Sequence, residues 1–194
     1  EFEKNIDISK PSTSHFGIVD KDGNAVSMTS TVEGPFGSHL MAGGFMLNNE
    51  LTDFSMLPEL NGRKIANRVQ PNKRPMSSMT PTIIFKDKNL FALTGSPGGT
   101  SIINYVTKSV LGLIDWGLDP SEVTELPHYM NRGNYTELEK NTVLENLATE
   151  LESLGHPIKI QNKRSGLHIA LKKDNGYIGC LLYTSPSPRD LSQS

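Results

Sequence analysis

Hydrophobic and polar residues near the start of the chain alternate in the pattern of a β-hairpin. Residues 13–20 place Phe16 and Ile18 on one face, and residues 24–32 are rich in Val and Thr, which suit strands. The Asp-Lys-Asp-Gly sequence between them is typical of a type I turn in which Gly23 takes a positive φ. The pattern therefore predicts two antiparallel strands joined by a tight loop.

The length of this loop decides which residues face each other. A three-residue loop, residues 21–23, pairs Asp20 with Asn24 and places Thr13 opposite Thr31, with both side chains on one face. A two-residue loop would instead pair Thr13 with Val32 and turn Thr31 to the other face. We favour the three-residue loop because a glycine bulge at its end fits the turn sequence.

Apolar runs separated by turn residues predict a mixture of strands and helices in the rest of the chain. Short strands are predicted at 45–47, 82–85, 90–94, 158–160 and 167–171. A helix is predicted after the glycine-rich segment 95–101, and its buried face is expected to consist of Ile103, Val106, Val110 and Leu113.

Two further helices are predicted from their N-terminal capping sequences. Residues 119–122 form a capping box with proline at the first helical position, and residues 142–145 form a second box. The second helix is expected to bury a stripe of leucines, at positions 144, 147, 151 and 154. Residues 57–75 contain Asn, Pro and basic residues and predict a long loop.

Length and composition indicate one globular domain or most of one. The chain has 194 residues and a net charge of −2, and it lacks a basic run, which argues against nucleic acid as a partner. No apolar run approaches the ~18 residues of a membrane-spanning helix. Residues 1–12 are polar and are interpreted as a lead-in, whereas residues 180–194 lack core periodicity and are interpreted as a foreign or disordered tail.

The first candidate for chemistry is the hydroxyl of Thr13. A threonine hydroxyl needs a nearby base, and the α-amine of an N-terminal threonine, with a pKa of about 7.7–8.0, can serve. Thr31 across the hairpin is placed to orient that hydroxyl. The same residues also fit a hairpin with ordinary surface threonines, and the spacing alone does not decide between the two.

Other polar residues predict sites for a small zwitterionic ligand. Glu50 and Asp53 share a face if their segment is helical, which suits a ligand ammonium; a solvated turn or oxygen ligands for Ca²⁺ are alternatives. Ser77 and Ser78, near Arg74, suit a carboxylate, although loop hydrogen bonding is the commoner role of such serines.

The segment Gly95-Ser96-Pro97-Gly98-Gly99 links a strand to a helix N-terminus, an arrangement that points backbone N–H groups at negative charge. It lacks the Gly-Lys-Ser/Thr of a nucleotide-binding loop and the Gly-x-Ser-x-Gly of a serine hydrolase. Gly98 and Gly99 therefore remain candidates for an oxyanion hole, with a simple helix cap as the alternative. The five histidines show no metal-binding spacing and are interpreted as structural or surface residues.

Several longer stretches resemble the small, catalytic subunit of the γ-glutamyltransferases (γ-glutamyltranspeptidase, glutathione hydrolase), over residues 13–179. The resemblance rests on the motifs Thr13-Ser14-His15-Phe16, Asp20-Lys21-Asp22-Gly23-Asn24-Ala25-Val26, Leu47-Asn48-Asn49-Glu50, Asp53-Phe54, Pro71-Asn72-Lys73-Arg74-Pro75, Ser77-Ser78-Met79-Thr80-Pro81-Thr82 and Gly95-Ser96-Pro97-Gly98-Gly99.

The resemblance implies an α+β fold, the four-layer αββα sandwich of the N-terminal nucleophile (Ntn) hydrolases. It implies a precursor that cleaves itself between Ser12 and Thr13. Thr13 would then attack the carbonyl of a γ-glutamyl group, as in glutathione, to form an ester that passes to water or to an amino-acid or peptide acceptor. No cofactor or metal is expected.

The resemblance also implies roles for individual residues. Thr31 would support the nucleophile, and Gly98 and Gly99 would form the oxyanion hole. The α-amino group of the substrate would be held by Glu50 and Asp53, and its α-carboxylate by Ser77 and Ser78. Glu33 stands where some members have Asn and would also contact the amino group.

The expected partner is a large subunit from the same precursor, which in the family contributes an Arg and part of the sandwich. The chain as written carries twelve residues before Thr13 and lacks that subunit, so alone it is expected to be inactive. No nucleic acid or membrane segment is expected, and the resemblance implies a periplasmic or secreted location. The alternatives are a related glutaryl or cephalosporin acylase, a poly-γ-glutamate-cleaving transpeptidase, and a non-catalytic domain that keeps only the fold.

Overall fold

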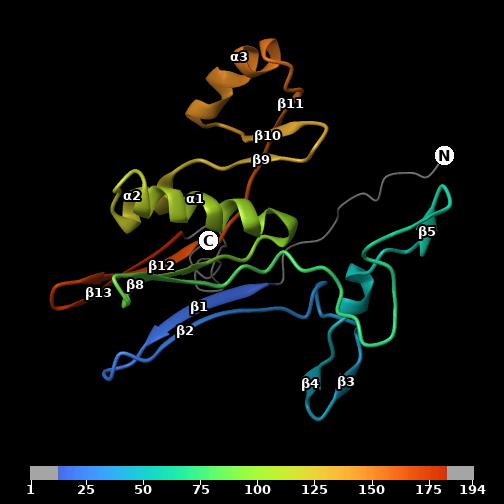
Figure 1. The fold of residues 1–194 in the computed structure, drawn as a ribbon, viewed down its shortest axis with the longest axis horizontal. Helices are drawn as coiled ribbons and strands as arrows, with labels where there is room; N and C mark the ends of the chain where they lie inside the picture. Colours follow the sequence, from blue (N-terminus) through green and yellow to red (C-terminus); the bar gives the residue numbers. More distant parts are fainter. Residues whose placement is uncertain (1–12, 183–194) are drawn as a thin grey trace, which may run out of the picture.

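The computed structural model describes residues 13–182, and its centre is a four-stranded antiparallel sheet (Figure 1). The strand order is β13-β12-β8-β7. Helices α1 (Ile102–Ile114) and α2 (Pro120–Glu125) pack on one face of this sheet. The four strands are β7 (Thr82–Lys86), β8 (Asn89–Gly95), β12 (His168–Lys173) and β13 (Gly176–Leu181).

The opposite face of this sheet is covered by the hairpin of β1 (Ser14–Val19) and β2 (Ala25–Ser30), which packs on β8 and β12 (Figure 1). Helices, sheet and hairpin form three stacked layers, and the α+β class is confirmed. A second helical layer, the fourth layer of the expected sandwich, does not occur among residues 13–182.

The register of the hairpin is the predicted one. Ser14 pairs with Ser30 and Val19 with Ala25, so residue numbers of paired positions sum to 44. The backbone N–H of Asp20 donates to Asn24 at 3.0 Å, and Gly23 has a φ of 87°. The three-residue loop is therefore confirmed.

The two faces of the hairpin have unequal surroundings. His15 and Thr29 face the large sheet, where Ser27 donates to the Thr94 carbonyl at 3.3 Å. The prediction that Phe16 and Ile18 share a face is confirmed. Each side chain is about half exposed, which shows that this face points away from the sheet. Val26 and Met28 lie directly across from them and extend the same exposed apolar surface, the outer hairpin face.

The core lies between the sheet and the two helices, and it contains Ala92, Leu113, Val123, Leu167, Ile169 and Leu171. Helix α1 turns Ile102 and Val106 inward, whereas Ile103 is 48% exposed. The prediction that Ile103 is buried is therefore wrong. The buried face of α1 is centred on Ile102, Tyr105 and Ser109, and Ile103 is rotated by about 100° from Ile102 and so lies outside this face. Helix α2 has the predicted capping box, with the Asp119 N–H donating to Glu122 at 2.8 Å.

A smaller three-stranded sheet lies beyond α1, in the order β11-β10-β9. Its strands are β9 (Tyr129–Asn131), β10 (Thr136–Glu139) and β11 (Ile158–Gln161), and η3 (Val143–Leu147) and α3 (Ala148–Ser153) follow β10 in the chain. The predicted buried leucine stripe is wrong, since Leu147 and Leu154 are 44% and 68% exposed. The short helix contacts only the edge of this sheet, so half of the stripe has nothing to pack against.

Residues 31–81 connect the hairpin to β7 mainly through loops (Figure 1). They contain the small hairpins β3 (Met41–Ala42) with β4 (Phe45–Met46) and β5 (Glu59–Leu60) with β6 (Arg63–Lys64), and the 3₁₀ turn η1 (Glu50–Asp53). No helix among residues 13–182 has the length and apolar character needed to cross a bilayer.

The predicted end segments fall largely outside the described residues. Residues 1–12 and 183–194 are not described. At the C-terminal side, β13 continues through Cys180 and Leu181, which pair with Ile169 and His168. Ordered pairing thus extends past residue 179, where the tail was expected to begin.

Candidate functional site

The two threonines predicted to face each other are in contact. The Thr13 hydroxyl donates to the Thr31 hydroxyl at 3.2 Å, and both side chains are half-buried. The Thr31 oxygen also accepts the backbone N–H of Glu33 at 2.8 Å. The Thr31 hydroxyl is therefore oriented from two sides at the end of the hairpin, and it holds the Thr13 oxygen in place.

The chain leaves β2 through Glu33, which adopts a left-handed conformation with a φ of 72°. Asn49 stabilises this turn: its side-chain amide donates to the Glu33 carboxylate at 2.9 Å and accepts the Gly34 N–H at 2.8 Å. Asn49 directly precedes η1, so it connects the hairpin end to the segment carrying Glu50 and Asp53. Sequence reasoning assigned no role to Asn49; an Asn between two acidic candidate residues was the only signal.

Three carboxylates, of Glu33, Glu50 and Asp53, lie close enough to interact, and the backbone N–H of Glu33 donates to Thr31. Glu50 and Asp53 lie on the single turn η1, as predicted. Burial raises the pKa of Glu50 above its usual range, and the carboxylates of Asp53 and then Glu33 raise it further. One carboxylate oxygen of Glu50, Oε1, is buried and has no hydrogen-bond partner among the described residues. This arrangement favours a positively charged ligand at Glu50.

Ser77 and Ser78 lie in the extended segment that precedes β7. The Ser77 hydroxyl accepts the Met79 N–H at 3.2 Å, and the Ser78 carbonyl accepts the Thr80 hydroxyl at 2.8 Å. Asn67 ties this segment to η1, because its side chain donates to the Asp53 carbonyl at 2.6 Å and accepts the Met76 N–H at 2.9 Å. Asn67, another residue that sequence reasoning missed, thus holds the serine segment beside the carboxylates.

Gly98 and Gly99 lie between β8 and α1. Gly98 has a φ of 141° and Gly99 a φ of 57°, both favoured by glycine, and Gly99 begins the 3₁₀ turn η2 (Gly99–Ser101). Gly99 has open space where a side chain would stand. The backbone is therefore open at Gly99, whereas the Tyr105 ring lies against the Cβ position of Gly98.

His15 connects β1, the strand that follows Thr13, to the glycine loop. Its ring occupies the space in which a Gly95 side chain would stand, and Gly95 ends β8 three residues before Gly98. His15 is 4% exposed, and its Nδ1 lies 2.8 Å from the Thr29 hydroxyl. Burial, and then neighbouring His168, lower the pKa of His15 to about 4. The neutral ring therefore packs the start of β1 onto the end of β8.

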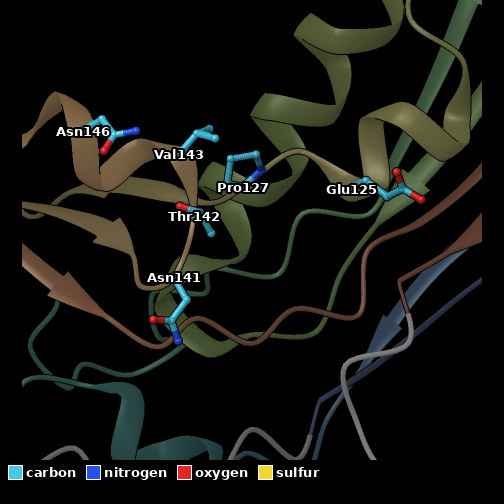
Figure 2. Close-up of a pocket in the computed structure, with 6 residues that line it drawn as sticks. All are labelled: Glu125, Pro127, Asn141, Thr142, Val143 and Asn146. Carbon is cyan, nitrogen blue, oxygen red and sulfur yellow. The ribbon is translucent and has the colours of Figure 1, made fainter.

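A hollow of about 540 Å³ lies elsewhere, between the end of α2 and the start of η3 (Figure 2). Its wall includes Glu125, Thr142 and Val143, and it shares no residue with the threonine and carboxylate sites. Among residues 13–182, no group of three or more His, Cys, Asp or Glu side chains is arranged to hold a metal ion.

These side chains divide the site into three chemical parts. Thr13 offers a hydroxyl oriented by Thr31, and the glycine loop offers accessible backbone beyond His15. The carboxylates offer negative charge in η1 and at Glu33, whose backbone N–H donates to Thr31. Such a combination suits acyl transfer from a small substrate that carries a positive charge.

Comparison with known proteins gives a consistent family. The sequence model described as gamma-glutamyltranspeptidase matches residues 3–190. A glutathione hydrolase proenzyme of Bacillus subtilis (strain 168) is 40% identical over 171 residues, which are 84% of this chain and 28% of that protein. The glutathione hydrolase proenzyme of Escherichia coli (strain K12) is 47% identical over 124 residues, 60% of this chain and 21% of that protein.

Solved structures agree. The Helicobacter pylori gamma-glutamyltranspeptidase T380A mutant superposes with a TM-score of 0.74 at 32% identity, covering 87% of this chain and 96% of that one. A Bacillus halodurans cephalosporin acylase has a TM-score of 0.72 at 22% identity, covering 85% of this chain and 31% of that one, and shares the fold. The chain spans about a quarter of the length of the two curated proenzymes.

Proposed function

The chain belongs to the gamma-glutamyltranspeptidase family, and on that premise we propose that Thr13 is the nucleophile of an enzyme that transfers or hydrolyses γ-glutamyl groups. The observation that carries the proposal is the Thr13–Thr31 hydroxyl contact at 3.2 Å, next to the convergent carboxylates. The Glu33 N–H fixes the Thr31 hydroxyl that accepts from Thr13.

We propose that the bond between Ser12 and Thr13 is cut in a precursor, in keeping with the proenzyme names of the relatives. The new α-amine of Thr13 then accepts the hydroxyl proton as Oγ1 bonds to the γ-carbonyl carbon. The amide C–N bond breaks, the leaving amine takes that proton, and a γ-glutamyl ester remains on Thr13. Water or an acceptor amine then attacks the ester and restores the hydroxyl.

The neighbouring groups fit the charges of such a substrate. The carboxylates of Glu50 and Asp53, with Glu33, would hold the α-ammonium, which would satisfy the unpartnered Glu50 oxygen. Ser77 and Ser78 would hold the α-carboxylate, and the N–H groups of Gly98 and Gly99 would stabilise the oxyanion. Glutathione and related γ-glutamyl amides have this combination of groups.

The proposed partner is a large subunit from the same precursor. The relatives are longer proteins, and the outer hairpin face presents Phe16, Ile18, Val26 and Met28, each 41–54% exposed. Paired apolar side chains on the centre of a hairpin are normally covered. We propose that the large subunit covers this face and supplies the missing helical layer.

The test is a mass spectrum of the full-length precursor that we propose contains this chain. Two chains are expected, the smaller one beginning at Thr13, and Thr13→Ala is expected to leave one chain. Ser14→Ala, a change at the exposed neighbouring position, is the matched control and should still be cleaved. Cleavage at another bond, or continued cleavage in Thr13→Ala, would refute the assignment.

The acylase alternative is tested with paired substrates. Glu50 and Asp53 favour an α-amino acid head group, since a glutaryl group has no ammonium to neutralise them. The mature enzyme should therefore cleave γ-glutamyl anilide much faster than glutaryl anilide. The reverse preference would favour the acylase, and inactivity on both after correct cleavage would favour a non-catalytic domain.

A further inference from the structure

A buried histidine outside the threonine and carboxylate sites forms a side-chain network below the glycine loop. His128 is 2% exposed and lies between α2 and β9. Lys108 of α1 lies 2.9 Å from its Nδ1, and the Ser165 hydroxyl lies 2.7 Å from its Nε2. The Tyr105 ring packs against it with centroids 4.1 Å apart. Both ring nitrogens and one ring face are therefore in contact with other buried groups.

The chemistry of these groups determines the direction of each hydrogen bond. Burial lowers the pKa of Lys108 to about 8, so below that pH its amine is charged and can only donate. Under those conditions Nδ1 of His128 accepts from Lys108, and Nε2–H donates to Ser165. Burial, and then Lys108 and Lys163, lower the pKa of His128 to about 3. Between about pH 3 and pH 8 the ring is therefore neutral, and the hydrogen bonds run in one direction from Lys108 through His128 to Ser165.

The first connection from His128 to the glycine loop runs through Tyr105. The Tyr105 ring lies against Gly98: a Cβ placed there would stand 2.6 Å from Tyr105 Cε2. Gly98 has a φ of 141°, a conformation that side-chain-bearing residues rarely adopt. His128 packs against the same Tyr105 ring, so a shift of His128 would be transmitted through that ring to the Gly98 backbone.

The second connection runs through Ser165. The residues on either side of Ser165 lie against the same loop. The Arg164 carbonyl is 3.6 Å from the Cβ position of Gly98, and Pro97 Cγ is 2.7 Å from the Cβ position of Gly166. Ser165 is 4% exposed and is held by His128. The hydrogen bond between His128 and Ser165 therefore fixes a segment that packs on Pro97 and Gly98.

We propose that His128 is a positioning residue that sets the backbone of the Pro97–Gly99 loop through Tyr105 and Ser165. The inference rests on the proposed function, in which the N–H groups of this loop bind the developing oxyanion. Because those groups act on charge that appears only in the transition state, a displaced loop should lower kcat and leave KM nearly unchanged. A role confined to packing would change thermal stability without this separation.

The experiment measures kcat and KM for a γ-glutamyl anilide with the mature, two-chain enzyme. His128→Phe keeps a ring against Tyr105 and removes both nitrogen contacts. Ser165→Ala removes only the connection to segment 164–166. His156→Phe is the matched control, because His156 is exposed on the loop after α3. Cleavage at Thr13 is confirmed for each variant by mass spectrometry before its rates are measured.

We expect His128→Phe to lower kcat about 10–100-fold with KM within about 3-fold, since a misplacement of about 1 Å costs on the order of 100-fold. Ser165→Ala should give a smaller loss with the same pattern, and His156→Phe should match the unmodified enzyme. Unchanged kcat in both network variants would overturn the proposal, and so would a loss that appears mainly in KM.

The outcomes separate this proposal from the proposed function. If the unmodified mature enzyme has no γ-glutamyl activity, the proposed function fails. If the unmodified enzyme is active and the network variants are equally active, only the role of His128 fails. Should both variants fail to fold or to expose Thr13, the network would be needed for folding in general, and the specific role would be refuted as well.

Discussion

The Thr13 hydroxyl donates to the Thr31 hydroxyl at 3.2 Å, although eighteen positions separate the two residues in the chain. The contact follows from the register of β1 and β2, in which every pair is set by the three-residue turn at residues 21–23. A slip of one position would turn Thr31 to the outer face and leave Thr13 opposite Val32. The turn thus sets the position of Thr13 through the pairing of the two strands.

Replacing Thr31 tests the importance of this contact. Thr31→Ala removes the acceptor for both Thr13 and the Glu33 N–H, so the Thr13 hydroxyl, the proposed nucleophile, loses its orientation. We expect kcat to fall by about 10–100-fold in the mature enzyme, as for a misplaced reacting group, and Thr31→Ser to retain most activity. Steady-state kinetics measures both, with Ser30→Ala as the exposed neighbouring control. Full activity in Thr31→Ala would contradict the role.

Neutralising Glu50 should weaken substrate binding without lowering the stability of the fold. Glu50→Gln removes a charge held near Asp53 and Glu33, so the midpoint of thermal unfolding should stay equal or rise. KM for a γ-glutamyl substrate should rise by about 10–100-fold, since hydrogen bonds to charged groups contribute about 1.5–3 kcal/mol.

Calorimetry and kinetics on one preparation measure the two effects of Glu50→Gln together. Glu59→Gln, at an exposed position in β5, is the control and should change neither quantity. A large loss of stability with unchanged KM would assign Glu50 to the fold and not to substrate binding.

The buried histidines predict a pH dependence of stability. His15 has a pKa of about 4 in the fold and about 6.5 when unfolded, so above about pH 6.5 both states are neutral and its contribution to stability is fully present. As the pH falls from about 6.5 to about 4, the unfolded state binds a proton that the folded state does not, and stability is lost.

The loss approaches about 1.4 kcal/mol per pH unit for each such histidine. The midpoint temperature of thermal unfolding should therefore fall on acidification. It should fall less steeply in His15→Asn, because the unfolded state of this variant cannot bind a proton at position 15. His39→Asn, at an exposed position, should follow the unmodified curve. Parallel curves for all three proteins would show that His15 titrates normally in the fold.

Adding one methyl group at Gly95 tests the packing of β1 on the large sheet. The side chain of Gly95→Ala would overlap the His15 ring, so β1 would have to move away from the end of β8. We expect a loss of about 1–3 kcal/mol in the free energy of unfolding, typical of overpacking, and reduced activity through Thr13. Gly179→Ala has open space in β13 and should change neither. Wild-type stability of Gly95→Ala would show that the contact is loose.

The local features of the site were predictable because short-range rules decide them. The Asp-Lys-Asp-Gly turn sets which hairpin residues pair, and side chains alternate between the two faces of each strand. Together these rules place Thr13 against Thr31. The i, i+3 spacing of Glu50 and Asp53 places both on one turn once that turn forms. Glycines at 98 and 99 allow positive φ between a strand and a helix.

The unpredicted features depend on which surfaces meet. The alternation in β1 defines two faces, but only the packing of the hairpin on β8 and β12 turned His15 inward and left Phe16 and Ile18 outside. The leucines of η3 and α3 form a regular stripe, yet η3 contacts β10 and α3 contacts the edge strand β11, and Leu147 and Leu154 stay exposed. Asn49 and Asn67 act through partners 9 to 16 positions away, which no local pattern indicates.

The sequence by itself determined the strand register, the turn, the paired carboxylates and the family motifs, because each depends on backbone geometry over a few residues. Only the tertiary structure decided that the His15 ring fills the space above Gly95 and that His128 lies under Tyr105 and the glycine loop. Those contacts join segments far apart in the chain. Close packing in three dimensions selects them, and the hydrophobic pattern along the chain does not encode that packing.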